Sequence, residues 1–331
     1  MTKNYPVLPV GVRRDLAKAS TENAYLAVLA EHKELSCPVT SRHEGNVGRD
    51  VRAMAGLLGV GARVAETWAK AAYYHDIGKT LVPDAIVNKS GPLTDDEMAT
   101  MRDHTLFGAR VLSACPSPLA RTAATLALYH HERWDGKGYH GLSGKQIPLS
   151  ARVLSVCDVW DALTSPDRPY KGPIPPEEAL GIMVDPSPAA RVGQNAFDPY
   201  ILKVFVEHKL ELHKGEISPE KADVIRAGLD ERLMSDRKVA EISYGSLEDY
   251  AKRLGQLDKG APDAHNNSER RSLVVEALTD HRKFDLVKKS SSELLARLYL
   301  RDDFPEAGIL LNLARSEKAR EQAPATRFAA R

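Results

Sequence analysis

Five histidines and three aspartates between positions 43 and 161 carry the chemistry that this sequence can perform. They are His43, His75, Asp76, His104, His130, His131, Asp158 and Asp161. Imidazole nitrogens and carboxylates at this density suit a cluster of first-row transition metals better than a single structural ion. The residue types therefore predict a metal centre, provided that the chain folds so as to bring them together.

The first of these histidines lies on the apolar face of a predicted helix. From about Thr40, His43 is followed by Val47, Val51 and Met54 at helical spacing, so these side chains point the same way. A histidine on such a face is more often an ordinary core residue than a ligand. The interpretation of His43 as a ligand therefore depends on the residues that follow it.

His75 and Asp76 stand at the end of the next predicted helix, which turns Val64 and Trp68 inward. We expect Gly78 to let the backbone leave the helix at this point. Adjacent side chains inside a helix diverge by about 100°. The end of the helix is thus what allows the pair to aim at neighbouring metals.

Two further helices add imidazoles. Thr94 and Glu97 form the pattern of a capping box and predict the start of the helix that carries His104. A helix from about 118 to 131 ends in His130 and His131, and two successive histidines at a helix end are hard to explain as packing. Metal ligation, or one ligand and one proton donor, explains them.

Two carboxylates occupy one face of the helix predicted over 151–164. Asp158 and Asp161 lie in an otherwise apolar segment, and burying them without a partner would be costly. Ligation of a cation would remove that cost.

Two loops offer donors for a substrate. The glycine-rich stretch 134–141 carries Lys137 and Tyr139, and a tight surface turn is the alternative explanation for it. Arg168 and Lys171 follow the last acidic helix, where a guanidinium fork and an ammonium group suit phosphate oxygens. A solvated loop is the alternative there.

Composition sets the general class. The 331 residues are 43% hydrophobic and 27% charged with a formal net charge of +1, so charge alone implies no nucleic-acid partner. The three cysteines form no CxxC pair, which fits a reducing compartment. The first fifteen residues lack an apolar signal-peptide core, and no run reaches the length of a membrane span. We expect a cytoplasmic protein with no membrane association.

The periodicity predicts an all-α fold in three parts. Residues 1–38 form an N-terminal helical lead-in with one helix over 12–35, and residues 39–210 form the catalytic domain. Residues 211–331 form a C-terminal helical extension of unknown role, with a disordered tail over 316–331.

The motifs over residues 40 to 206 resemble those of the HD-GYP family, a branch of the HD-domain metal-dependent phosphohydrolases. The resemblance rests on four stretches, His75-Asp76-Ile77-Gly78-Lys79, Asn88 to Thr94, His130 to Tyr139, and Asp158 to Thr164. Phe197-Asp198-Pro199 fits as well. The family implies an HD-domain helical bundle and a bacterial second-messenger phosphodiesterase that cleaves cyclic di-GMP to pGpG, GMP or both.

The resemblance also implies roles for individual residues. The metal ligands would be His43, His75, Asp76, His104, His130, His131 and Asp158. Asp76 would bridge two metals, and Lys79, Arg168, Lys171 and Tyr139 would contact substrate. Asp76, Lys79 and Asp161 form the expected catalytic set, in which Asp161 orients a ligand histidine. A hydroxide bridging the two metals would attack the phosphate in line.

Three features depart from the family pattern. One is Pro166, which resembles a one-residue insertion before Asp167-Arg168-Pro169-Tyr170 and so affects the aim of Arg168. Relatives with three metals carry a glutamate where this chain has Val39, so we expect two divalent metals, iron first and manganese as the alternative. The last residue of the signature, proline in the family, is His140 here.

Two other functions stay open, and the family suggests partners. The site could act on another nucleotide, or the chain could be a catalytically weak module that binds cyclic dinucleotides. Besides a cyclic dinucleotide, we expect as partners a GGDEF-type or other signalling protein at the Gly138-Tyr139 loop and a second copy of the chain.

Overall fold

The computed structural model describes residues 7–36, 40–115, 117–166, 172–187 and 192–229. These residues contain helices and turns but no strand, which confirms the predicted all-α class. The predicted helices and tail beyond residue 229 lie outside the described part of the chain.

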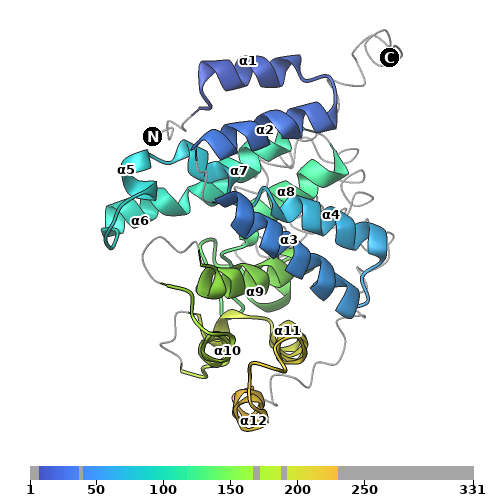
Figure 1. The fold of residues 1–331 in the computed structure, drawn as a ribbon. Coiled ribbons are helices and arrows are strands. Elements are labelled where there is room, and N and C mark those ends of the chain that lie inside the picture. The colour runs from blue at the N-terminus through green and yellow to red at the C-terminus, as the bar shows by residue number, and fades with distance from the viewer. Residues whose placement is uncertain (1–6, 37–39, 116, 167–171, 188–191, 230–331) are drawn as a thin grey trace, which may run out of the picture. The chain divides into compact units, whose positions relative to one another are not determined.

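The helices follow one another along the chain as Figure 1 labels them. The α-helices are α1 (Val10–Lys18), α2 (Glu22–Ser36), α3 (Thr40–Leu57), α4 (Ala62–Ala72), α5 (Asp84–Val87), α6 (Asp95–Arg102), α7 (His104–Ser113), α8 (Pro118–Tyr129), α9 (Leu149–Thr164), α10 (Pro176–Met183), α11 (Pro199–Leu212) and α12 (Pro219–Ala227). In the part of the chain that the structure describes, three 3₁₀ helices lie between them, η1 (Ile77–Leu81), η2 (Gly144–Gln146) and η3 (Gln194–Ala196). No helix in the described part is long and apolar enough to cross a membrane.

Contacts between Cα atoms divide the chain into two compact units. Of the described helices, the first unit contains α1, α2, η1, α5, α6, α7 and nearly all of α8, whereas the second contains α3, α4, η2, α9, α10, η3, α11 and α12. Both units carry histidines and aspartates of the predicted metal set.

In the first unit, α2 is tied to α7 and to the start of α8. The Tyr25 hydroxyl donates to the Val111 carbonyl at 2.9 Å, and the Ser117 hydroxyl donates to the Glu22 carboxylate at 2.7 Å. Leu29 on the same helix is fully buried. The region predicted as a lead-in is therefore part of the packed first unit.

The single helix predicted over residues 12–35 is wrong, because the structure contains two. Helix α1 ends at Lys18, and Ala19 is extended. The Thr21 hydroxyl then accepts the backbone N–H of Ala24 at 3.1 Å, which satisfies a donor in the first turn of α2. Helices α1 and α2 lie side by side (Figure 1).

In the second unit, α3 packs against α4 and α9. The predicted apolar stripe of α3 is confirmed, since Val47, Val51 and Met54 have no exposed surface. The inward orientation predicted for Val64 on α4 is wrong, because its side chain is 47% exposed while Ala65 is buried. The error is one of register, since the buried face of α4 begins one residue later.

A buried lysine links α11 to α3 and α9. The Lys209 ammonium lies 2.7 Å from the Asp50 carboxylate and 5.0 Å from the centroid of the Trp160 ring. Lys209 is only 4% exposed, so its charge depends on these partners. The contact fixes α9, the helix that carries Asp158 and Asp161.

Candidate metal centre

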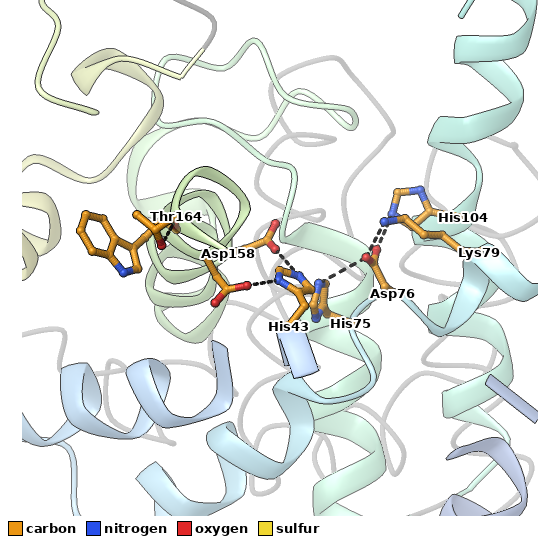
Figure 2. Close-up of polar contacts among 9 residues, drawn as sticks. His43, His75, Asp76, Lys79, His104, Asp158 and Thr164 are labelled. Atoms are coloured by element: carbon orange, nitrogen blue, oxygen red, sulfur yellow. Dashed lines mark hydrogen bonds and ion pairs between the residues drawn. The ribbon is translucent and has the colours of Figure 1, made fainter. Parts of the chain in front are cut away.

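In the first unit, Asp76 lies between two imidazoles. One carboxylate oxygen is 3.5 Å from Nε2 of His75, and the other is 3.3 Å from Nε2 of His104. Lys79 adds an ammonium group 2.5 Å from the oxygen that faces His75 (Figure 2). The two histidines are at most 1% exposed and Asp76 is 6% exposed, so this cluster is buried.

A backbone carbonyl fixes the orientation of the His104 ring. Nδ1 of His104 lies 2.6 Å from the carbonyl oxygen of Met101, which can only accept, so Nδ1 is the protonated nitrogen. Nε2, which faces Asp76, is then the ring nitrogen available to a metal ion. A ligand histidine in proteins almost always donates its other ring N–H in this manner.

The Asp76–His104 distance depends on Gly78. A Cβ atom on Gly78 would lie 1.9 Å from the His104 carbonyl oxygen and 2.5 Å from the Gly108 nitrogen. The prediction that Gly78 lets the backbone leave the helix is wrong, because α4 has already ended at Ala72 and Gly78 lies inside η1. Glycine is required there because η1 and α7 approach each other closely.

In the second unit, His43 on α3 lies between two carboxylates of α9. Nδ1 of His43 is 2.6 Å from Asp161, and Nε2 is 3.1 Å from Asp158. The two aspartates are three residues apart and therefore share one face of the helix. Asp161 thus holds the His43 ring by Nδ1. Nε2 is directed toward Asp158 (Figure 2).

The consecutive histidines follow the last residue of α8. Their ring centroids are 4.0 Å apart, and they offer ring nitrogens within 4.8 Å of each other. The Tyr139 ring lies 4.6 Å from that of His131. His130 is 1% exposed whereas His131 is partly exposed, so the second imidazole and Tyr139 are the more accessible of the three.

Residues 134–141 form the signature loop, and its aspartate, Asp135, is held as an anion. Arg133 places two guanidinium nitrogens 2.7 Å and 3.0 Å from the Asp135 carboxylate. Burial alone would raise the pKa of Asp135, but the hydrogen bonds from Arg133 and from the Lys137 N–H lower it below its ordinary value. Asp135 is therefore a structural carboxylate of the loop and a poor proton donor at neutral pH.

Phe197-Asp198-Pro199, which fits the family pattern, joins two helices to the signature loop. Asp198 accepts the backbone N–H groups of Tyr200 and Ile201 at the start of α11, and it also lies 2.5 Å from the buried guanidinium of Arg152. Arg152 in turn lies over the Trp134 ring of the signature loop at 5.7 Å. The motif thus connects α11 and α9 to the loop after the paired histidines.

The spacing of the donor atoms fits metal ligation. Two ligand atoms each about 2.1 Å from one ion, at angles of about 90–109°, are about 3.0–3.4 Å apart. The distances from Nε2 to the carboxylate oxygen are 3.1 Å at His43, 3.3 Å at His104 and 3.5 Å at His75. The Nδ1 contacts of His43 and His104 are shorter, 2.6 Å each, as expected of hydrogen bonds. These imidazoles and carboxylates are donors that iron, manganese or zinc accepts.

Arg168 and Lys171, the predicted phosphate contacts, lie outside the described residues. The structure reaches the C-terminal end of α9, where the Thr164 hydroxyl donates to the Trp160 carbonyl at 2.9 Å.

Within the described residues, the helices and the clustered histidines and aspartates define a metal-binding helical domain. The model of the HD domain family matches residues 27–196, and the chain belongs to that family. The resemblance to its HD-GYP branch, predicted from the motifs, is confirmed.

Curated relatives share this part of the chain. A cyclic di-GMP phosphodiesterase of Thermotoga maritima is 42% identical over 156 residues, which cover 47% of this chain and 41% of the relative. A probable cyclic di-GMP phosphodiesterase of Vibrio cholerae is 38% identical over 201 residues (56% and 44%). A 3'3'-cGAMP-specific phosphodiesterase 2 of the same organism is 33% identical over 195 residues (59% and 36%). The chain therefore spans less than half of the length of these relatives.

Proposed function

We propose that this protein is a metal-dependent phosphodiesterase that hydrolyses cyclic di-GMP to pGpG, GMP or both. The observation that carries the proposal is Asp76, a buried carboxylate with one oxygen toward His75 and the other toward His104. A carboxylate that faces two ligand nitrogens in this way suits a bridge between two metals. Membership of the HD domain family agrees with it.

We assign the metal site to seven residues, which supply five imidazoles and two carboxylates. They are His43, His75, Asp76, His104, His130, His131 and Asp158. Two divalent ions, iron first and manganese as the alternative, would supply Lewis acidity at the phosphate and a lower pKa for the attacking water. In His43 and His104 the contact at Nδ1 orients the ring so that Nε2 would be the ligand atom.

The protein's own groups position the substrate and balance its charge. Lys79, which is partly exposed and paired with Asp76, offsets negative charge on the nonbridging phosphate oxygens. Asp161 keeps the His43 ring in the ligand orientation and contacts no substrate. Tyr139 offers a ring face and a hydroxyl to the nucleotide, and Arg168 and Lys171 complete the phosphate contacts.

A second substrate is favoured by one comparison. The relative that is 33% identical over 195 residues is named for 3'3'-cGAMP, another cyclic dinucleotide. The same site would cleave it by the same chemistry, since the phosphodiester groups are alike and only the base differs. The remaining alternative, a weak binding module, would bind such nucleotides without turnover.

The test is an anaerobic incubation of the iron- or manganese-loaded protein with cyclic di-GMP and, separately, with 3'3'-cGAMP. Chromatography of the products identifies the linear dinucleotide and the mononucleotide. The double variant His75→Ala/Asp76→Ala should lose bound metal and hydrolysis together while its circular dichroism stays helical. His213→Ala, which removes an imidazole outside the proposed ligand set, is the matched control.

The outcomes separate the three functions. Cleavage of cyclic di-GMP alone supports the proposal, and preferred cleavage of 3'3'-cGAMP supports the second substrate. Metal-loaded protein that binds either nucleotide but leaves it intact supports the binding module. Hydrolysis that survives in the metal-free double variant would refute the metal-dependent mechanism.

Location and partners belong to the same proposal. We propose a cytoplasmic protein, on the basis of scattered cysteines of which Cys115 and Cys157 are buried thiols. A GGDEF-type or other signalling protein at Gly138 and Tyr139, a homodimer, and a regulatory role for residues 211–331 are proposed as well. Size-exclusion chromatography with light scattering tests the dimer directly.

A further inference from the structure

The loop after the paired histidines is closed by one buried carboxylate. Glu132 is 2% exposed, and its two oxygens accept different backbone N–H groups, one from His140 and one from Leu142, each at 2.6 Å. Hydrogen bonds to an ionised acceptor are stronger than neutral ones. Glu132 therefore holds the backbone on the C-terminal side of Tyr139.

The loop lies directly on the segment that carries Glu132. A Cβ atom on Gly138 would be 2.6 Å from Cα of Glu132 and 2.8 Å from the nitrogen of Arg133. Tyr139 thus lies between Gly138, which is in close contact with the backbone of Glu132 and Arg133, and His140, whose N–H is bound to the Glu132 carboxylate. Its ring is held 4.6 Å from the ring of His131 as a result.

The residue at position 140 departs from the family signature. The family signature has proline there, and proline has no backbone N–H. His140 has one, and it is bound to Glu132 at 2.6 Å. A hydrogen bond thus does here what the rigid ring of proline would do in the signature, namely restrict the backbone next to Tyr139.

We propose that Glu132 is a positioning residue, which sets Tyr139 against His131 by binding the backbone N–H groups of His140 and Leu142. The effect on catalysis rests on the proposed function, in which Tyr139 contacts the nucleotide. The closure of the loop itself does not depend on the identity of the substrate.

Trypsin cleavage after Lys137 measures the closure independently of activity. The Lys137 side chain is 64% exposed and precedes Gly138, so opening of the loop presents this peptide bond to the protease. In Glu132→Gln, the amide NH₂ faces one of the two N–H donors and only one acceptor oxygen is left. We expect cleavage after Lys137 to be about tenfold faster than in the wild type. Mass spectrometry of the fragments measures it.

Kinetics and metal analysis distinguish positioning from a general loss of structure. We expect the KM of Glu132→Gln for the cyclic dinucleotide to rise about tenfold, with kcat changed less, because binding energy from Tyr139 is lost. Bound metal per chain should stay at the wild-type value. A merely structural role would instead lower metal content and folded fraction together.

Two variants at His140 separate the backbone from the side chain. His140→Ala keeps the N–H and should behave as the wild type in both assays. His140→Pro replaces the hydrogen bond by the rigid ring, so it should also stay close to the wild type and should reduce the effect of Glu132→Gln when the two changes are combined. The combined variant keeps the test decisive if Glu132→Gln alone fails to fold, because the ring restores the restriction of the backbone. Gln146→Ala is the matched control, because it removes a different side-chain bond to the backbone, that to the Ser143 N–H at 3.1 Å.

The results that overturn the proposal are specific. Wild-type proteolysis in Glu132→Gln would show that the carboxylate does not hold the loop. Faster proteolysis with an unchanged KM would show that the loop is held but does not position Tyr139. If no cyclic dinucleotide is cleaved by the wild type, the proposed function fails, and the proteolysis still decides whether Glu132 closes the loop.

Discussion

Replacing Gly78 by alanine tests whether the close approach of η1 to α7 determines the metal site. The new Cβ atom would lie 1.9 Å from the His104 carbonyl oxygen, whereas an ordinary contact begins at 3.4 Å. The two segments must therefore separate by roughly 1.5 Å, the difference between those two distances. The atoms in contact are backbone on the α7 side, so no side-chain rotation can relieve the overlap.

Two consequences of the separation can be measured. Overpacking of this kind costs about 1–3 kcal/mol in the free energy of unfolding, which lowers Tm by several degrees. A shift of about 1.5 Å between Asp76 and His104, now 3.3 Å apart, also exceeds what a shared metal tolerates. We expect bound metal to fall by at least half and kcat to fall about 100-fold or more.

Metal content by mass spectrometry, Tm by circular dichroism and kcat are measured on the same preparations. Gly91→Ala is the matched control, because a Cβ atom there meets nothing within 4 Å and should leave all three quantities unchanged. A Gly78→Ala protein with wild-type metal content and Tm would refute the reasoning, since the overlap would then have been absorbed without moving the ligands.

Three further predictions concern the second unit. Asp161→Asn should weaken metal affinity about 10–100-fold, because the neutral amide holds the His43 ring less firmly than the carboxylate does. Metal titration measures this change. Lys209→Met should lower the free energy of unfolding by about 2–4 kcal/mol in urea, since it leaves Asp50 without its ion-pair partner, and the added change Asp50→Asn should recover part of the loss. Burial raises the pKa of the Cys157 thiol well above its ordinary value, and the nearby Asp50 carboxylate raises it further. The buried thiol stabilises the fold while it is neutral. This contribution to the free energy of unfolding is fully present below the pKa of the thiol in the unfolded chain, about 8.5. It falls by about 1.4 kcal/mol per pH unit as the pH rises above that value. The stability advantage of wild type over Cys157→Ala should therefore shrink between pH 8 and 10 in urea titrations, and a constant difference would contradict the cause assigned to the shift.

The elements of the fold were predictable where the sequence carries a long periodic signal. The stripe of α3 is buried as predicted because its apolar residues recur at helical spacing from Val47 to Met54. The buried face of the shorter α4 was assigned one residue early, since Ala65 and Val64 are both apolar and burial depends on which one meets α3. The break between α1 and α2 was missed because it depends on local capping by Thr21, which a periodicity argument over a long window does not register.

The residue types of the site were predictable, but the reasons for several of them were not. A glycine after a helix suggests a turn, and the partner that requires Gly78 lies some 30 residues later, on α7. The role of Glu132 was also missed, although it follows the paired histidines directly. The signal in the sequence would have been a carboxylate next to a glycine-rich loop, because the backbone N–H groups of such a loop have no helical partners and need acceptors. Contacts of this kind become visible only when the chain has folded.

The His104 and His43 rings differ in which substitutions can change their orientation. The acceptor for His104 is the backbone carbonyl of Met101, so replacing the Met101 side chain leaves the acceptor in place. The acceptor for His43 is the side chain of Asp161, which a single substitution removes. A local backbone bond is therefore tolerant of sequence change, whereas the bond between α3 and α9 requires a carboxylate at one position. For this reason Met101→Leu should keep the metal affinity of the wild type while Asp161→Asn lowers it, and equal losses in the two variants would show that the rings are held by packing instead.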